Sequence, residues 1–264
     1  MQTVDCMITW IVIPARNEAQ RIVPTMKEYA KGIHGKGIGI VVVSSSTDGT
    51  DRIISMYSKK YNFIKLIKNR EEEGKGGAII KGFMYAMKKN PSFIGFLDAD
   101  GSVGCNEFLR MLSILRNDKR LDGVIASRYS KGGKINGSLP ISRFIASRAY
   151  NMLIRSLFKI NVKDTQCGAK IFRANALSKV IGSLTILGMS FDVDLLYSLK
   201  LSGRIIKEIG VKYNQSNEGT SISIARNAPQ MLIAALGFRI YKSRFRAMVP
   251  KKLMQFVYNR IKRW

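Results

Sequence analysis

Short apolar runs alternate with longer amphipathic segments through the first hundred residues of the chain. The apolar runs cover residues 7–14, 39–43, 63–68 and 92–97, and helical periodicity lies between them over 17–29, 50–61 and 77–89. This alternation predicts right-handed βαβ units, and therefore an α/β fold whose mostly parallel sheet is flanked by helices. Ligands of such sheets bind at the carboxyl ends of the strands. The polar segments 14–18, 44–50 and 98–102 are therefore expected to meet at one edge.

The second half of the chain is less regular. Its pattern predicts strands over 123–127, 169–173 and 204–213, and helices over 108–116 and 192–201. Residues 139–159 read as one long helix or two short ones, and SKGGKINGS before them reads as a loop. No internal repeat or low-complexity linker is present. The simplest division is one domain over residues 1–225 and a basic amphipathic tail over 226–264.

The charge of the chain is unusual. Lys and Arg number 44 against 18 Asp and Glu, which gives a formal net charge of +26 over 264 residues, and no acidic residue follows Glu218. Such an excess implies an anionic partner, which is nucleic acid, anionic lipid or a phosphorylated substrate. No recognised nucleic-acid-binding motif is present, and the aromatic residues do not form a stacking pattern. A nucleic-acid partner is therefore not expected.

Cysteine usage and hydropathy suggest where the protein works. The three cysteines are far apart and form no CxxC pair, which fits a reducing compartment. The N-terminus lacks the pattern of a signal peptide. No apolar run approaches the ~18–20 residues of a membrane span. The expectation is a peripheral protein at the cytoplasmic face of a membrane, with a membrane-protein partner left open.

The segment FLDADG places Asp98 and Asp100 where a buried strand meets the ligand edge. In an extended segment, residues i and i+2 point to the same side. Two carboxylates on one side suit Mg²⁺ or Mn²⁺, which takes one or two carboxylates together with substrate phosphates. The alternative is a turn that merely favours Asp and Gly.

The segment REEEGKGGA surrounds Lys75 with Gly74, Gly76 and Gly77 just before a predicted helix. Glycines let backbone N–H groups approach a phosphate, and a helix N-terminus adds positive potential. The Walker A spacing is absent. By itself, the segment is equally consistent with a flexible loop.

Six motifs in order, IPARNEA, SSSTDGT, GKGGA, LDADG, ASR and DTQCGAKIF, resemble the family 2 glycosyltransferases of the GT-A fold. The later pattern RxxxSxxxN, DTQCGxK and FDV is similar to the polyprenyl-phosphate branch, the dolichyl-phosphate glucose and mannose synthases. The resemblance covers roughly residues 8–240. It implies inverting transfer of a hexose from a nucleotide-diphosphate sugar to a polyprenyl or dolichyl phosphate, with a divalent metal, Mg²⁺ or Mn²⁺, as cofactor.

The same resemblance implies site residues, position by position. The implied catalytic residues are Asp100, Arg128, Gln166 and Asp192, and Asp98 and Asp100 are the implied metal ligands. The implied donor-nucleotide residues are Pro14, Arg16, Asn17, Glu18, Ser44, Lys75, Gly76 and Asp98. The implied acceptor-phosphate residues are Arg128, Arg143 and Lys170. A phosphomonoester is largely dianionic at neutral pH, so it needs cations more than a general base. Asp192 therefore has three possible roles: orienting the acceptor, removing a proton, or capping a helix.

One motif departs from the family pattern. In VVVSSSTDGT, Val43 and Ser44 stand where the family commonly carries two aspartates, one of which reads the nucleotide base. Catalysis can survive this change, whereas base selectivity is in doubt. GKGGA and DADGS favour UDP-glucose over GDP-mannose. The alternatives are a catalytically impaired sugar-nucleotide-binding relative, a hydroxyl-acceptor transferase in polysaccharide or glycoprotein assembly, and, remotely, a basic nucleic-acid-binding protein.

Two basic segments have an apolar face at helical spacing. They are LPISRFIASRAYNMLIRSLFK and the tail VPKKLMQFVYNRIKRW, in which Leu253, Phe256, Val257, Ile261 and Trp264 share a face. Basic residues beside such a face favour a helix that lies in an anionic membrane interface. The alternative is an ordinary surface helix packed on the core. The sequence therefore predicts C-terminal amphipathic helices at an anionic membrane surface.

Overall fold

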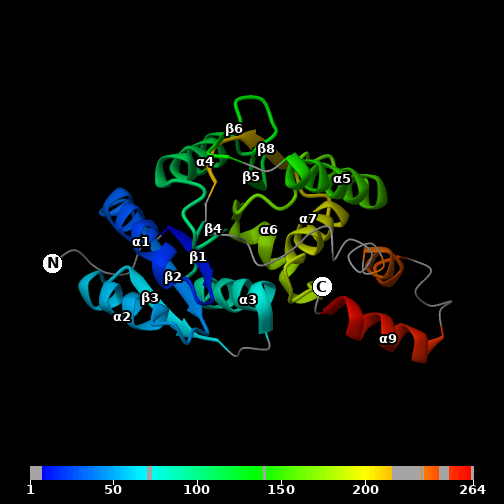
Figure 1. Ribbon diagram of the computed structural model, residues 1–264, viewed down its shortest axis with the longest axis horizontal. Helices are drawn as coiled ribbons and strands as arrows, with labels where there is room; N and C mark the ends of the chain where they lie inside the picture. Colours follow the sequence, from blue (N-terminus) through cyan, green and yellow to red (C-terminus); the bar gives the residue numbers. More distant parts are fainter. Residues whose placement is uncertain are drawn as a thin grey trace.

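A computed structural model of the chain describes residues 8–69, 73–138, 141–215, 233, 235–243 and 250–262. Seven strands form one central sheet (Figure 1). Their order across the sheet is β3 (Ile64–Lys68), β2 (Ile38–Ser44), β1 (Thr9–Ala15), β4 (Phe93–Leu97), β7 (Ala169–Arg173), β5 (Gly123–Ser127) and β8 (Ile206–Gly210). All pairs are parallel except those of β7, which runs antiparallel to both β4 and β5. The predicted mostly parallel α/β sheet is thus confirmed, and the reversed β7 is an addition to it.

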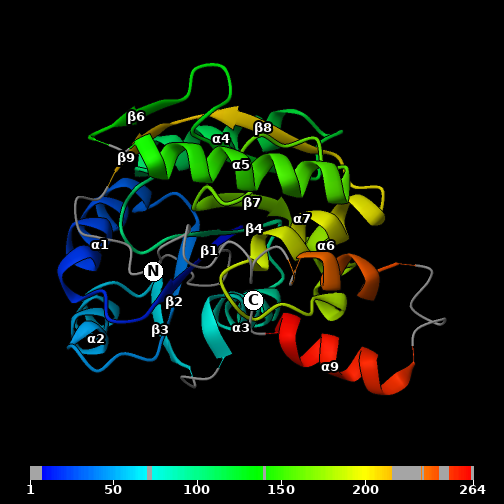
Figure 2. The ribbon, with the colours of Figure 1, turned by 45° about the vertical axis from the view of Figure 1, so that its right-hand side comes forward.

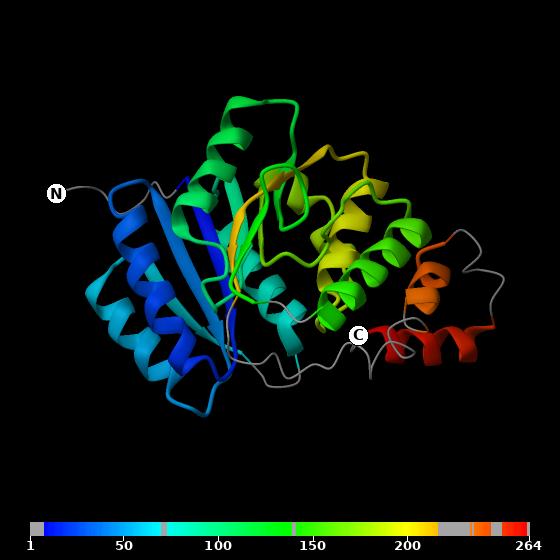
Figure 3. The same cartoon turned by 45° about the horizontal axis from the view of Figure 1, so that its top comes forward.

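Helices cover both faces of the sheet. One face carries α1 (Ala19–Ile33), α2 (Thr50–Lys60) and α4 (Cys105–Asn117), which share one apolar cluster with the strands. The other face carries α3 (Gly74–Met87), α5 (Ile141–Phe158), the short α6 (Ala174–Ser178), α7 (Phe191–Leu201) and α9 (Lys251–Lys262). Figure 3 shows α1 and α2 on the side of the molecule away from α9. The result is a three-layer α/β arrangement.

Several boundaries differ from those that the sequence predicted. Helix α1 begins at Ala19, with Glu18 as its N-cap. It does not extend back to Asn17, because the backbone of Asn17 is left-handed (φ 55°). Helix α3 begins at Gly74, so Lys75 lies in its first turn and not in a preceding loop. The predicted strand 204–213 is divided into β8 and β9 (Lys212–Asn214), and β9 pairs with β6 (Lys134–Asn136) in a second, two-stranded sheet. The expected SKGGKINGS loop therefore contains a strand.

The C-terminal residues pack on the same core as α3 and α7. Ala235, Phe238 and Ile261 are fully buried within that cluster, whereas Phe256 on the opposite side of α9 is 66% exposed. The apolar face predicted for a membrane interface is thus divided, because Ile261 is in the core and Phe256 is in solvent. Leu253, Trp264 and the proposed boundary at 225/226 lie outside what the structure describes. Within the described ranges, no helix is both long and apolar enough to cross a bilayer.

Candidate active site

The carboxyl ends of β1, β2, β4 and β5 lie at one edge of the sheet, as predicted for parallel strands. Because β7 is reversed, the residues that precede it, and not those that follow it, reach this edge. The register places Ala169 opposite Leu97, so the segment that ends at Gly168 lies beside Asp98. Strand reversal thus brings DTQCG to the LDADG motif.

Asp98 packs directly against Gly168. The N–H of Asp98 donates to the carbonyl of Gly168 at 2.8 Å. A Cβ at position 168 would overlap Oδ2 of Asp98, so any side chain there must displace the carboxylate. Gly168 was not assigned a role from the sequence. Its lack of a side chain leaves space for the Asp98 carboxylate.

Lys75 connects the carboxylates of the site. Its ammonium lies 2.7 Å from Oδ1 of Asp98 and 3.8 Å from Oδ2 of Asp192, and its side chain is 14% exposed. Burial alone would lower the pKa of Lys75, but Asp98, Asp192 and Asp100 outweigh it and hold that pKa above its ordinary value. Burial raises the pKa of Asp98 despite Lys75, and Asp100 and Asp192 add to the rise. Lys75 thus lies among three carboxylates and pairs with two of them, Asp98 and Asp192.

Asp100 is the carboxylate of this group without an ion pair in the described part of the chain. Its Oδ1 accepts hydrogen bonds from the backbone N–H and the hydroxyl of Ser102, at 3.0 and 2.6 Å. Asn214 N–H of β9 donates to the Ser102 carbonyl at 2.8 Å, and Tyr213 forms an isolated antiparallel bridge with Val103. The second sheet therefore orients Asp100 through Ser102.

A divalent cation fits this arrangement. Asp98 and Asp100 supply the hard oxygen ligands that Mg²⁺ and Mn²⁺ prefer, and Asp100 has no ion pair of its own among the described residues. No group of three or more His, Cys, Asp or Glu side chains converges in the described ranges, so the protein alone does not complete a coordination shell. Substrate phosphates commonly complete such shells. Whether Asp98 and Asp100 are metal ligands stays a prediction.

Lys170 is fully buried and forms an ion pair with Asp192, which is 1% exposed. Its ammonium also donates to the carbonyl of Cys167 at 2.9 Å and lies 5.2 Å from the ring centre of Phe96. Lys170 therefore neutralises Asp192 within the protein interior, and its ammonium is not exposed at the surface of the site. Helix α7 begins at Phe191 with Ser190 as its N-cap, so Asp192 lies in the first turn and does not occupy the capping position.

Arg128 is held by a partner that the sequence analysis did not assign. Its guanidinium forms two bonds of 2.8 Å with the buried carboxylate of Asp164, which also accepts the Arg128 N–H at 2.9 Å. The guanidinium lies 5.1 and 5.3 Å from the ring centres of Tyr129 and Tyr213, and Arg148 lies 4.6 Å from Tyr129. Burial alone would lower the pKa of Arg128, but Asp164 raises it, so the group stays charged.

The predicted nucleoside residues are divided between the edge and the interior. Glu18 faces the site, where burial raises its pKa against the opposing effect of Arg21, with Asp100 and Asp98 adding to the rise. Arg16 and Asn17 are exposed, and Pro14 is half-buried. Oδ1 of Asn17 accepts from Thr47 N–H at 3.0 Å, which joins the β1 and β2 loops.

Ser44 is 1% exposed, and its hydroxyl donates to Asp51 and contacts Ser46. The carboxylate that contacts Ser44 is therefore that of Asp51, in the first turn of α2, and not one at the strand end. Ser46, the other partner of Ser44, accepts a hydrogen bond from Asn17 N–H at 3.0 Å. Its role in reading a base stays a prediction.

The glycines of GKGGA allow close backbone packing. A Cβ at Gly74 would lie 2.5 Å from the carbonyl oxygen of Leu187, and one at Gly76 would lie 2.7 Å from that of Ile186. The N–H of Gly77 donates to the Leu187 carbonyl at 3.2 Å, so it is already bonded within the protein. These glycines therefore place the first turn of α3 against residues 186–188. Gln166 is half-buried near the edge, and the side chain of Arg143 lies outside the described set.

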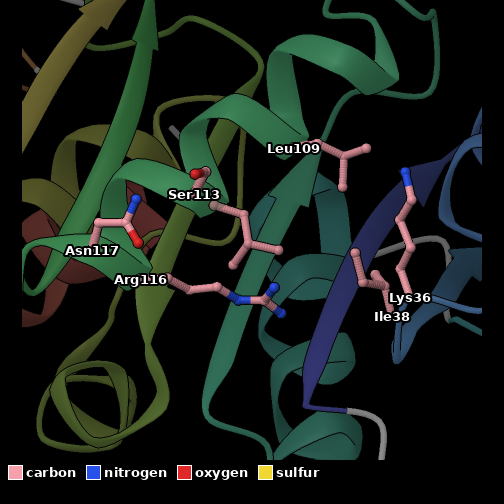
Figure 4. Close-up of a pocket in the computed structure, with 7 residues that line it drawn as sticks. Lys36, Ile38, Leu109, Ser113, Arg116 and Asn117 are labelled. Carbon is pink, nitrogen blue, oxygen red and sulfur yellow. The ribbon is translucent and has the colours of Figure 1, made fainter.

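Two hollows among the described residues lie away from this edge. One of about 500 Å³ is lined by Lys36, Ile38, Leu109, Leu112, Ser113, Arg116 and Asn117 (Figure 4). Ile38 begins β2, so this hollow is at the opposite end of the strands from Asp98. Another, of about 540 Å³, lies between residues 182–185 and the C-terminal helices. None of the predicted site residues lines either of them.

Asp164, Gly168 and Tyr213 were not assigned roles from the sequence. Asp164 and Gly168 carry a signal, because both belong to DTQCG and carboxylates are scarce in a chain of this charge. Tyr213 carries none, since its position depends on the pairing of β9 with β6.

The chain is similar in sequence to known sugar transferases. The chain is 28% identical over 219 residues to a dolichyl-phosphate beta-glucosyltransferase of Drosophila melanogaster, covering 78% of this chain and 66% of that one. It is 25% identical over 248 residues to a polyprenol monophosphomannose synthase of Mycolicibacterium smegmatis, covering 91% of each. The chain thus spans just under two thirds of the Drosophila relative and nearly all of the mycobacterial one.

Solved structures agree on the fold. Glucosyl-3-phosphoglycerate synthase from Mycobacterium tuberculosis, in complex with Mn²⁺, UDP and phosphoglyceric acid, has a TM-score of 0.64 at 15% identity, covering 88% of this chain and 78% of that one. This likeness confirms the predicted GT-A architecture. The family model of glycosyl transferase family 2 matches residues 10–181, from β1 through the site to the segment after α6. The chain therefore belongs to glycosyl transferase family 2.

Proposed function

We propose that the protein is an inverting glycosyltransferase that moves a hexose from a nucleotide-diphosphate sugar to a polyprenyl or dolichyl phosphate. The observation that carries the proposal is the cluster of Asp98, Asp100 and Lys75 at the carboxyl edge of a family 2 sheet. The two relatives, a dolichyl-phosphate beta-glucosyltransferase and a polyprenol monophosphomannose synthase, support this acceptor class.

The chemistry needs little from a general base. A phosphate oxygen of the acceptor attacks the anomeric carbon, the bond from that carbon to the diphosphate breaks, and the nucleoside diphosphate leaves with the electron pair. A divalent cation, Mg²⁺ or Mn²⁺, would stabilise the charge that develops on the leaving diphosphate. Asp98 and Asp100 would hold it. Lys75 would hold Asp98 in place, and Ser102 would hold Asp100.

The acceptor side is proposed to lie near α5. Ile141, Phe144 and Ile145 at the start of this helix are 77%, 42% and 60% exposed. Phe144 contacts the Tyr129 ring at a centroid distance of 5.8 Å, and Tyr129 adjoins Arg128 and Arg148. An apolar surface beside guanidinium groups suits a phosphate on a hydrocarbon chain at an anionic membrane surface. Together with Phe256 on α9, it supports peripheral membrane binding.

The donor is proposed to be UDP-glucose in preference to GDP-mannose. The GKGGA and DADGS motifs favour it. The Ser44 hydroxyl donates to Asp51, so Asp51 is the carboxylate in direct contact with the end of β2. Calorimetric titration of UDP, GDP and their sugars, with Mn²⁺ and with EDTA, measures the preference directly.

The decisive test is Asp100→Asn, with Asp118→Asn as its matched control. Asp118 is an acidic residue that pairs with Arg120 far from the edge. Transfer of labelled sugar to polyprenyl phosphate is expected to fall by roughly a thousandfold in Asp100→Asn, because several kcal/mol of electrostatic stabilisation is lost. Asp118→Asn is expected to keep normal activity. Undiminished transfer by Asp100→Asn would overturn the metal assignment.

A further inference from the structure

The C-terminal helix reaches the active site through one short segment. This segment, residues 184–190, connects the 3₁₀ helix Ile181–Ser183 to α7 and lies between α9 and α3. On one side, Leu187 N–H donates to the carbonyl of Lys262 in the last turn of α9, at 2.8 Å. On the other, the Leu187 carbonyl accepts from Gly77 N–H at 3.2 Å. A single residue thus bonds both helices.

The contact with α3 is tight. A Cβ at Gly74 would lie 2.5 Å from the Leu187 oxygen, and one at Gly76 would lie 2.7 Å from the Ile186 oxygen and 2.8 Å from Cβ of Phe191. The first turn of α3 therefore follows residues 186–187 with almost no clearance. Lys75 is part of that turn, and its ammonium reaches Asp98 and Asp192. The location of Lys75 depends on where residues 186–187 lie.

The segment is also bonded to α7, and α7 in turn contacts Lys242 in the C-terminal part of the chain. Asp194 is fully buried and accepts hydrogen bonds from the N–H groups of Thr185 and Ile186. Lys242 lies 3.3 Å from the Asp194 carboxylate. Asp192, two residues earlier in α7, pairs with Lys170 and Lys75. The two carboxylates of α7 thus serve different partners, the active site and the C-terminal residues.

Helix α9 is held in place by its inner face. Ile261, one residue before Lys262, is 1% exposed in the core cluster that also holds Ala78, Ile79 and Phe191. Phe256 on the outer face is 66% exposed. Figures 1 and 2 show the C-terminal end of α9 directed toward α3. Helix α9 therefore has two distinct faces. The inner face packs on the core, and the outer face is exposed and can contact a membrane.

We infer that α9 is a positioning element of the active site, which places Lys75 through Leu187, in addition to any role in membrane binding. Ile261 is its positioning residue. The inference rests on the proposed function in taking Lys75 as part of the donor site. It requires that loosening the inner face of α9 loosens the first turn of α3, even with no membrane present.

The experiment compares Ile261→Ala with Phe256→Ala on the same helix, and uses hydrogen exchange of the full chain without ligand. Ile261→Ala is expected to speed the exchange of residues 74–77 by about fivefold to tenfold. Exchange in α1 is expected to stay unchanged, since the buried residues of α1 pack in the apolar cluster on the other face of the sheet. Phe256→Ala is expected to leave both regions as they are. Ile261→Val keeps most of the buried volume, and it is expected to restore most of the protection.

A second readout measures UDP binding by calorimetry with Mn²⁺ and without lipid. Ile261→Ala is expected to weaken it by about fivefold to tenfold, and Phe256→Ala to leave it unchanged. If Ile261→Ala does not fold, Ile261→Val is measured in the same way, with a smaller shift expected in the same region. Unchanged exchange at residues 74–77 in a folded variant, or equal acceleration in α1, overturns the inference. If the unsubstituted protein binds no nucleotide, the proposed function fails, and the exchange measurement still decides the role of α9.

Discussion

The two halves of the molecule keep their charges in different places. Through residue 138, the fully buried polar side chains of the described residues are Ser and Thr, such as Thr25 and Ser102. Between residues 150 and 200, the core holds Asp164, Lys170, Asp192 and Asp194. The first half is therefore shaped by apolar periodicity, and the second half by buried ion pairs. A buried pair adds little stability over an apolar substitute, but the loss of one partner costs about 3–5 kcal/mol.

The largest expected effect is that of Asp164→Ala. This change leaves the Arg128 guanidinium and its backbone N–H without their acceptor in a largely buried place. We expect the free energy of unfolding to fall by about 3–5 kcal/mol, as measured by urea denaturation. A loss of unfolding free energy below about 1 kcal/mol would show that water hydrates the Arg128 guanidinium in the variant. The buried ion pairs would then not be what stabilises the second half.

Gly168→Ala tests the place where the two halves meet. The new Cβ must displace the Asp98 carboxylate, so the affinity for Mn²⁺ with UDP is expected to fall by at least about tenfold. Gly182→Ala is the matched control, because its Cβ would meet nothing within 4 Å. Titration calorimetry compares the two. Normal affinity in Gly168→Ala would mean that β7 does not set the position of Asp98.

The smallest expected effect is that of Asp48→Ala in the first half. Asp48 accepts hydrogen bonds from the N–H groups of Ala19 and Thr50, at the starts of α1 and α2. Because it is exposed and acts as a cap, its removal is expected to cost about 1 kcal/mol of unfolding free energy. Thermal and urea denaturation measure it beside Asp164→Ala. If the two losses were equal, the contrast between the halves would not hold.

Much of the first half could be predicted from the sequence. The apolar runs and the helices between them correspond to β1–β4 and α1–α3 within a few residues. Asp98 and Asp100 follow β4 at the ligand edge, as expected. Periodicity is a local property, and a parallel βαβ arrangement leaves few alternatives, so a local pattern was sufficient there.

The partners in the second half could not be predicted in the same way. The residue pattern of β7 is compatible with either direction, and only the reversed strand brings Gly168 to Asp98. Lys170, which the family resemblance places at the acceptor phosphate, is paired with Asp192 within the core, and the sequence did not predict this partner. The glycines of GKGGA suited either a phosphate-binding turn or a flexible loop, and in the structure they belong to the first turn of α3 and pack against residues 186–187. Each of these outcomes depends on a residue distant in sequence.

By itself, the sequence determined the family, the α/β architecture and the edge at which the site lies, because apolar periodicity and ordered motifs are encoded in neighbouring residues. The tertiary structure decided which charge pairs with which, and which face of α9 is buried. Those choices follow from the low dielectric and close packing of the interior, where a charge must find a partner wherever the fold provides one.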